Sequence, residues 1–122
     1  FRIPDMEAGE KVMAYVESLE PEDKDCVLVI EGGVDRPPYE KFEGIAKLFD
    51  HAKACAAEIG FDLQDLKTGG GSDGNFTGAL GIPTLDGLGA DGHGAHSNDE
   101  YIYYSSLVER CHLMIKLMET LD

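Results

Sequence analysis

The sequence predicts an α/β fold with a packed core, and two observations indicate this. After residue 40, segments with apolar residues at helical spacing alternate with short continuous apolar runs, and glycine-rich loops separate them. Apolar residues make up 43% of the 122 residues, which is enough for a packed core. The first 35 residues predict only one helix and one strand, which cannot bury both of their faces alone.

Two helices are predicted with clear boundaries. Residues 5–19 form an amphipathic pattern, with Asp5 in the N-cap position. Residues 45–59 repeat apolar side chains at helical spacing, and Gly60 suits the left-handed residue that often follows a helix. Each of these helices is therefore expected to bury one face.

Two further helices are expected nearer the C-terminus. A brief helix over residues 75–80 is ended by Gly81. The last helix runs from about Ser106 to Leu121, and Ser106 with Glu109 matches a capping box. Its predicted buried stripe comprises Leu107, Cys111, Met114, Met118 and Leu121.

Three short strands complete the expected pattern. The run Cys26–Ile30 is continuously apolar and rich in β-branched residues, which is typical of a buried strand. Residues 61–66 and 82–88 are two more short strand candidates, each lying between a helix and a glycine-rich loop.

Composition and charge narrow the function. A formal charge of −14 repels nucleic-acid phosphates and anionic lipid, so neither a nucleic acid nor a membrane is an expected partner. No apolar run reaches the about 18 residues of a membrane helix. The cysteines match no zinc-finger spacing and are interpreted as small buried hydrophobes, which favours a reducing, cytoplasmic location: Cys26, Cys55 and Cys111. Because the chain begins at Phe1 rather than Met, we expect it to follow a processing step or to be a piece of a longer protein.

The loop Gly69–Asn75 and Arg36 are candidates for anion binding. Glycine lets a backbone approach a ligand closely, and N–H groups at a helix start attract a carboxylate or phosphate. Arg36 precedes two prolines, and a rigidly held guanidinium suits bidentate carboxylate recognition. The alternative for the loop is a tight turn with Asp73 or Asn75 as a cap, and the alternative for Arg36 is a solvated side chain. The residue pattern leaves both open.

His96 is the candidate metal ligand. It follows a glycine-rich stretch, and neutral imidazole is the commonest metal ligand. One histidine cannot hold zinc, however, and no second His or Cys lies at a useful spacing. His93 could join His96, whereas His51 and His112 lie within predicted helices and are interpreted as structural.

Four motifs resemble, in their order along the chain, the M20 family of metallopeptidases, nearest its bacterial glutamate carboxypeptidase branch. They are Val34-Asp35-Arg36-Pro37-Pro38, Gly69-Gly70-Gly71-Ser72-Asp73-Gly74-Asn75, Gly81-Ile82-Pro83-Thr84-Leu85-Asp86-Gly87-Leu88-Gly89 and His93-Gly94-Ala95-His96-Ser97-Asn98-Asp99-Glu100-Tyr101. Phe1-Arg2-Ile3-Pro4 is similar to the end of a strand in the family's lid domain. The resemblance implies that residues 1–35 are the second half of an α+β lid, or dimerisation, domain. Residues 36–122 are then the C-terminal part of the zinc-peptidase catalytic domain.

The resemblance also implies roles for single residues. His96 matches the last ligand of a two-zinc site. Arg36 matches the arginine that grips the free carboxylate of the substrate, and Gly71 and Ser72 match the loop that helps to bind it. The general base and the other zinc ligands match nothing in this chain and are expected upstream in the protein.

The implied reaction is hydrolysis of an amide bond next to a C-terminal carboxylate, in a peptide or an N-acyl amino acid. The whole protein is expected to be a homodimer with two zinc ions, and this chain alone is expected to be inactive. Two other functions stay open. One is a non-catalytic module that binds a carboxylate ligand or a partner. The other is a proteolytic product whose strand edge at Cys26–Ile30 pairs with another copy.

Overall fold

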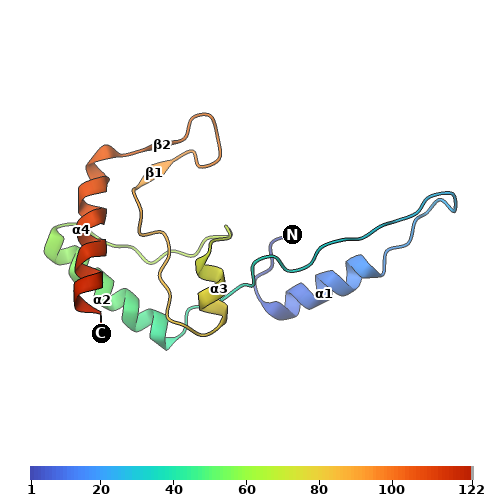
Figure 1. Ribbon diagram of the computed structural model, residues 1–122, viewed down its shortest axis with the longest axis horizontal. Coiled ribbons are helices and arrows are strands. Elements are labelled where there is room, and N and C mark those ends of the chain that lie inside the picture. Colours follow the sequence, from blue (N-terminus) through green and yellow to red (C-terminus); the bar gives the residue numbers. More distant parts are fainter. Residues whose placement is uncertain (122) are drawn as a thin grey trace. The chain divides into compact units, whose positions relative to one another are not determined.

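The computed structural model describes residues 1–121 and is mostly helical (Figure 1). Its elements are α1 (Met6–Glu17), α2 (Glu43–Ile59), α3 (Gly74–Ala79), β1 (Gly92–His93), β2 (Tyr101–Ile102) and α4 (Tyr104–Thr120). The chain divides into two compact units. The first consists of Phe1–Lys41 with Gly69–Ile82, and the second consists of Phe42–Thr68 with the chain from Pro83 onward. The assignment of residues 1–35 to a lid domain stays a prediction.

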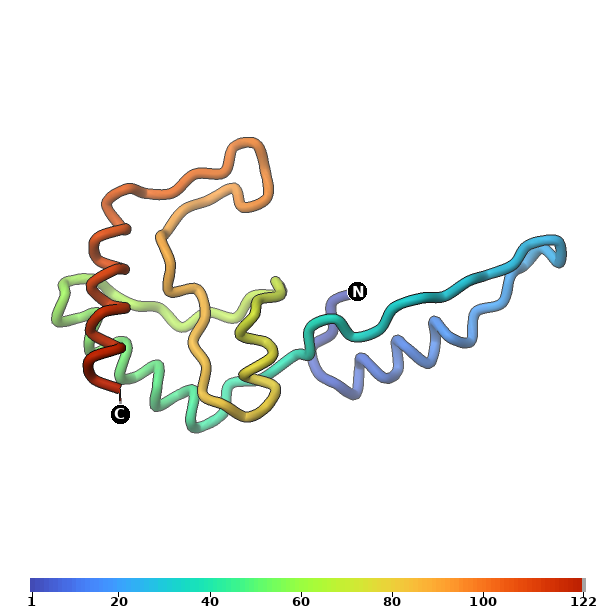
Figure 2. Tube along the Cα trace, viewed as in Figure 1, coloured from blue at the N-terminus to red at the C-terminus, as the bar shows by residue number. Residues whose placement is uncertain are grey.

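Helix α1 belongs to the first unit and confirms the helix predicted over residues 5–19. Asp5 is its N-cap, because Oδ1 of this side chain accepts a hydrogen bond from the Ala8 N–H at 2.8 Å. Gly9 is the buried residue of the helix. A Cβ atom there would lie 2.8 Å from Cδ1 of Ile3, so glycine lets the N-terminal segment lie against the helix. The chain then reverses direction after α1 (Figure 2).

The strand predicted over Cys26–Ile30 does not form. Its side chains are largely exposed, with Val27 at 88% and Val29 at 72%. An apolar run becomes a strand only where a neighbouring strand supplies hydrogen-bond partners, and β1–β2 is the only sheet within residues 1–121. The predicted strands over residues 61–66 and 82–88 are absent for the same reason. The sheet expected for an α/β fold is therefore not formed within residues 1–121, which have helices and one two-stranded hairpin.

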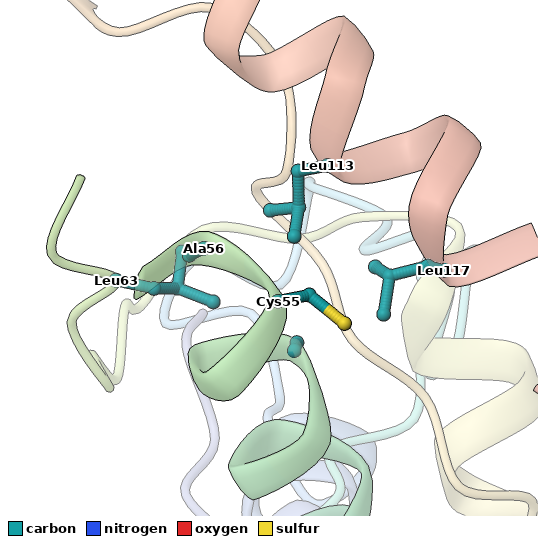
Figure 3. Close-up of a cluster of buried hydrophobic side chains, with 6 residues drawn as sticks. Cys55, Ala56, Leu63, Leu113 and Leu117 are labelled. Carbon is teal, nitrogen blue, oxygen red and sulfur yellow. The ribbon is translucent and has the colours of Figure 1, made fainter. Parts of the chain in front are cut away.

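The core of the second unit lies between α2 and α4 (Figure 3). Helix α2 confirms the predicted helix, and its C-cap Gly60 has a φ of 113°, a left-handed conformation that glycine adopts without strain. The buried residues that α2 contributes to this core are small, which lets the leucines of α4 approach closely. The cluster comprises Ala52, Cys55 and Ala56 of α2, Leu63, and Leu113 and Leu117 of α4, each at most 5% exposed.

The buried stripe predicted for the last helix is wrong. Leu113 and Leu117 are buried, whereas Met114 is 41%, Leu121 47% and Met118 70% exposed. Helix α4 carries apolar residues on two faces, so helical spacing alone cannot tell which face meets α2. The second face lines an open apolar pocket of about 340 Å³. No helix of residues 1–121 has the length and the apolar character needed to cross a membrane.

Two predictions about single residues also need correction. Ser106 is not an N-cap, because α4 begins two residues earlier and the Ser106 hydroxyl donates to the carbonyl oxygen of Tyr103 at 2.7 Å. Among the cysteines only Cys55 is buried, while Cys26 and Cys111 are exposed free thiols. Cys26 lies in the unpaired extended segment, and Cys111 lies on the solvent side of α4, which explains their exposure. The predicted short helix is confirmed as α3, followed by Gly81 with a φ of 78°.

Candidate functional site

Arg36 lies against the glycine-rich loop of the first unit. Its Nη2 atom is 3.2 Å from Oδ1 of Asp73, 37 positions away, and its Nη1 atom is 3.6 Å from Oδ2 of Asp35. The guanidinium carbon also lies 5.8 Å from the centre of the Phe76 ring, within the range of a cation–π contact. Because 41% of the Arg36 side chain stays exposed, the guanidinium is positioned and still accessible to a ligand.

The loop approaches Arg36 closely because it lacks side chains. A Cβ atom at Gly71 would lie 3.0 Å from Cδ of Arg36, a separation at which the arginine would have to move. A second guanidinium lies beside the same loop, since a Cβ atom at Gly69 would lie 3.2 Å from Nη1 of Arg2. The two segments that the resemblance assigned to carboxylate binding are thus in contact.

Asn75 ties the loop to the Arg36 segment. Its Oδ1 atom accepts a hydrogen bond from the Ser72 N–H at 2.9 Å, and its Nδ2 atom donates to the carbonyl oxygen of Pro37 at 2.9 Å. The Ser72 hydroxyl oxygen accepts from the Gly74 N–H at 3.1 Å. The N–H and the hydroxyl oxygen of Ser72 are therefore both hydrogen-bonded within the loop. The hydroxyl proton is the donor that Ser72 can offer to an anion. Asp73 and Asn75 were expected at most to cap a tight turn. The ion pair of Asp73 with Arg36 and the hydrogen bond of Asn75 to Pro37 were not foreseen, although both residues stand in the quoted motif.

His96 lies in the second unit, on the tight connection between β1 and β2. The two strands pair Gly92 with Ile102 and His93 with Tyr101. Ser97 closes the turn, because its N–H and its hydroxyl both donate to the carbonyl oxygen of Gly94, at 3.0 and 2.7 Å. The His96 N–H donates to Oε2 of Glu100 at 3.3 Å.

The backbone of His96 is unusual. Its φ of 65° makes it the one non-glycine residue of positive φ within residues 1–121. A left-handed conformation costs a non-glycine residue on the order of 1–3 kcal/mol and is often found at functional sites. The imidazole is exposed, so it is available to a ligand.

The residues present fit a single zinc ligand rather than a complete metal site. Zinc takes four ligands, but within residues 1–121 no three His, Cys, Asp or Glu side chains gather to hold a metal ion. The ring of His93 packs against the rings of Tyr101 and Tyr103. His51 is structural as expected, with Nε2 2.8 Å from the Thr120 hydroxyl.

An aromatic cluster at the base of the His96 turn was not foreseen. The rings of His93, Tyr101 and Tyr103 contact one another edge to face, with centroids 5.5 to 6.0 Å apart. A hydrogen bond with the Tyr101 hydroxyl, assisted by partial desolvation and by the Asp91 carboxylate, raises the pKa of Tyr103. Alternating aromatic residues at 101 and 103 were the signal in the sequence that could have revealed the cluster.

Comparison with known proteins agrees with the motif order. The model of peptidase family M20/M25/M40 matches residues 6–120. Carboxypeptidase G2 of Pseudomonas sp. (strain RS-16) is 35% identical over 100 residues, which cover 80% of this chain and 23% of that protein. The chain thus spans less than a quarter of the length of this curated relative. No solved structure shows a significant match. With nearly its whole length covered by the family model, the chain belongs to the M20/M25/M40 family of peptidases.

Proposed function

We propose that this chain supplies the carboxylate-binding element and one zinc ligand of a zinc-dependent peptidase or amidohydrolase. The observation that carries the proposal is the position of Arg36, whose guanidinium lies against Gly71 and pairs with Asp73 of the same loop. The substrate would be a peptide or an N-acyl amino acid, cleaved at the amide bond next to its C-terminal carboxylate. The relative named carboxypeptidase G2 supports this substrate class.

Each residue would have a distinct task. Arg36 would bind the substrate carboxylate with two parallel N–H donors, and Gly71 would leave room for it beside the loop. The Ser72 hydroxyl would donate a further hydrogen bond. His96 would hold one zinc ion through a ring nitrogen, and bound zinc supplies a Lewis acid and a water of lowered pKa. The remaining zinc ligands and the general base would come from another part of a longer protein, which we propose to be a cytoplasmic homodimer.

Carboxylate recognition can be tested on the chain itself. N-acetylalanine and N-acetylalaninamide differ only in the charged end group, and an NMR titration measures both dissociation constants. We expect the acid to bind and the amide to bind at least about tenfold more weakly, as is typical of hydrogen bonds to a charged group. Arg36→Gln should remove this difference, while Lys47→Gln on α2 should keep it and controls for the change in net charge. Equal binding of acid and amide to the unchanged chain would refute the carboxylate site.

Zinc binding and hydrolysis need a longer polypeptide that includes the upstream region. Metal analysis should find two zinc ions per chain, and His96→Ala should reduce this number and abolish hydrolysis. A non-catalytic module is the second candidate. Arg36 and the glycine-rich loop offer hydrogen-bond donors to a carboxylate, whereas no three His, Cys, Asp or Glu side chains gather to hold a metal ion within residues 1–121. A longer polypeptide that binds N-acetylalanine without hydrolysing it, and that binds no zinc, would favour the non-catalytic module.

A further inference from the structure

Helix α4 carries a second apolar stripe on the side that turns away from the core. Leu113 and Leu117 point from α4 toward α2 (Figure 3). On a helix, side chains spaced alternately four and three positions apart return to one face, and this spacing is typical of the narrow seam between paired helices. On α4 it joins five apolar residues, which we call the outer seam: Tyr104, Val108, Cys111, Ile115 and Met118.

The outer seam is open to solvent along its whole length. At its two ends, Tyr104 is 82% and Met118 70% exposed. Between them, Val108 is 58% and Ile115 48% exposed, and Cys111 is an exposed free thiol. Single exposed apolar residues are normal on a protein surface, whereas a contiguous apolar patch marks a site of interaction.

The two ends of α4 have complementary shapes. Tyr104, at the N-terminal end, offers a largely exposed ring. At the C-terminal end, Met114, Met118 and Leu121 line the open apolar pocket of about 340 Å³. A cavity of about 150 Å³ already holds a benzene ring, so this pocket has room for one aromatic side chain. Because Met118 belongs to both the outer seam and the pocket, ring and pocket lie on one continuous apolar surface.

A second copy of the chain can bring these two ends together. In a two-fold symmetric dimer, both partners use the same surface, which has to be complementary to itself. Tyr104 and Met118 each lie seven positions from Cys111, the middle residue of the outer seam. When two α4 helices run antiparallel about an axis beside Cys111, Tyr104 of each copy therefore lies opposite the partner's Met118, at the pocket.

The charge of α4 favours this contact over others. The whole chain has a formal charge of −14, which repels a second copy over most of its surface. Within α4, Glu109 and Glu119 are balanced by Arg110 and Lys116, so the helix has no net charge when His112 is neutral. Two copies of this acidic chain thus meet less repulsion along α4 than elsewhere.

We propose that the outer seam binds a second copy of this chain through antiparallel α4 helices, with Tyr104 of each copy in the apolar pocket of the other. The inference is independent of the proposed function, since Arg36, the glycine-rich loop and His96 all lie outside α4. A helix of 17 residues is about 25 Å long, and one pair of such helices gives an interface near the lower limit of about 1,200 Å² for stable complexes. The dimer should therefore be weak, with a dissociation constant in the micromolar range.

Analytical ultracentrifugation over a range of concentrations measures this equilibrium. The dimer fraction should rise with concentration and should rise further with added salt, because salt screens the repulsion between two acidic chains and leaves the apolar contact intact. Tyr104→Ala should weaken the dimer at least about tenfold, as truncation of a buried interface aromatic does. Tyr15→Ala on α1 is the matched control, since Tyr15 is also exposed, at 64%. Circular dichroism establishes that each variant keeps its helices.

The two exposed thiols identify the surface that pairs. Cys111 would lie beside the two-fold axis, whereas Cys26 lies on the extended segment after α1. A short bis-maleimide links two neighbouring thiols by forming a thioether at each, with no redox step. Cys26→Ser should still give a crosslinked dimer, and Cys111→Ser should give none.

Several outcomes would overturn the proposal. They are a monomeric mass at every concentration, a crosslink that requires Cys26 instead of Cys111, and an equal effect of Tyr104→Ala and Tyr15→Ala on the dimer. A longer polypeptide that includes the upstream region provides a further test. If it shields Cys111 from a maleimide while it is monomeric, the upstream region covers the outer seam and the second copy is excluded. The carboxylate site is judged separately, because Arg36→Gln should leave the dimer unchanged.

Discussion

The ion pair between Arg36 and Asp73 should compete with a substrate carboxylate. In the free chain, Oδ1 of Asp73 already lies 3.2 Å from Nη2 of Arg36, at the donors that the ligand would use. Binding therefore has to displace one carboxylate by another. Asp73→Asn keeps the shape of the loop and removes the competing charge, so it should tighten binding of N-acetylalanine.

The magnitude follows from the distance and the exposure of the pair. Coulomb's law gives about 1.3 kcal/mol for two unit charges 3.2 Å apart in bulk water. Asp73 is 94% exposed, and exposed ion pairs measure only about 0.2–1 kcal/mol because of screening and side-chain entropy. The affinity of Asp73→Asn should accordingly rise about 1.5- to 5-fold. The gain should shrink toward 1 M salt, where the Debye length falls to about 3 Å.

Calorimetric or NMR titration at low and high salt measures this effect. Glu10→Gln is the control, since it changes the net charge equally and Glu10 on α1 stands outside the ion pairs of Arg36. Binding to Asp73→Asn that is no tighter than binding to Glu10→Gln would refute the competition between Asp73 and the ligand. A gain that does not change with salt would also refute it, because an exposed charge must be screened.

Three further predictions concern stability and the hairpin. Urea denaturation should show that Leu113→Ala, at a buried position, lowers the free energy of unfolding by about 2–5 kcal/mol. Met118→Ala, at an exposed position, should change it by less than about 0.5 kcal/mol. Equal losses would contradict the observed orientation of α4. Gly92→Ala should disrupt the hairpin, because its Cβ would lie 2.1 Å from a backbone carbonyl oxygen of β2, and the ring-current shifts of the tyrosines should disappear from the NMR spectrum. The hydrogen bond from Lys116 lowers the pKa of Glu58 and the same bond raises the pKa of Lys116. The stabilisation of the fold by this pair should therefore be lost at both ends of the pH range. It is lost as the pH falls below 4.5, the ordinary pKa of a glutamate, toward the folded pKa of Glu58, and as the pH rises above 10.5, the ordinary pKa of a lysine, through the folded pKa of Lys116. In a pH series of urea denaturation, Glu58→Gln should remove both losses.

Local signals predicted the helices well. The cap at Asp5 and the left-handed Gly60 fixed two helix ends, because both depend on backbone geometry within a few residues. The strand at Cys26–Ile30 could not be predicted in this way, since a strand needs a partner from elsewhere in the fold. The orientation of α4 likewise depended on its neighbour, because leucines and methionines occupy two of its faces.

The candidate site was predictable only in outline. Anion-binding chemistry could be read from Arg36 and from the loop separately, but nothing in their spacing placed them in contact. Only the resemblance to the family, carried by the order of the motifs, assigned both to one binding function. In the structure, the hydrogen bonds of Asn75 to Ser72 and Pro37 hold the loop beside the Arg36 segment. The aromatic cluster escaped because it depends on the register that pairs His93 with Tyr101, and register is a property of the folded hairpin.

The left-handed backbone at residue 96 also limits which side chains can replace the one present. Asn, Asp and His are several-fold enriched among non-glycine residues of positive φ, and bulky or β-branched residues are outliers there. Of the side chains that bind zinc, only histidine and aspartate are among these. A change from imidazole to carboxylate is therefore open to this position in evolution or in engineering, while a change to thiolate would carry a conformational cost in addition to its chemistry.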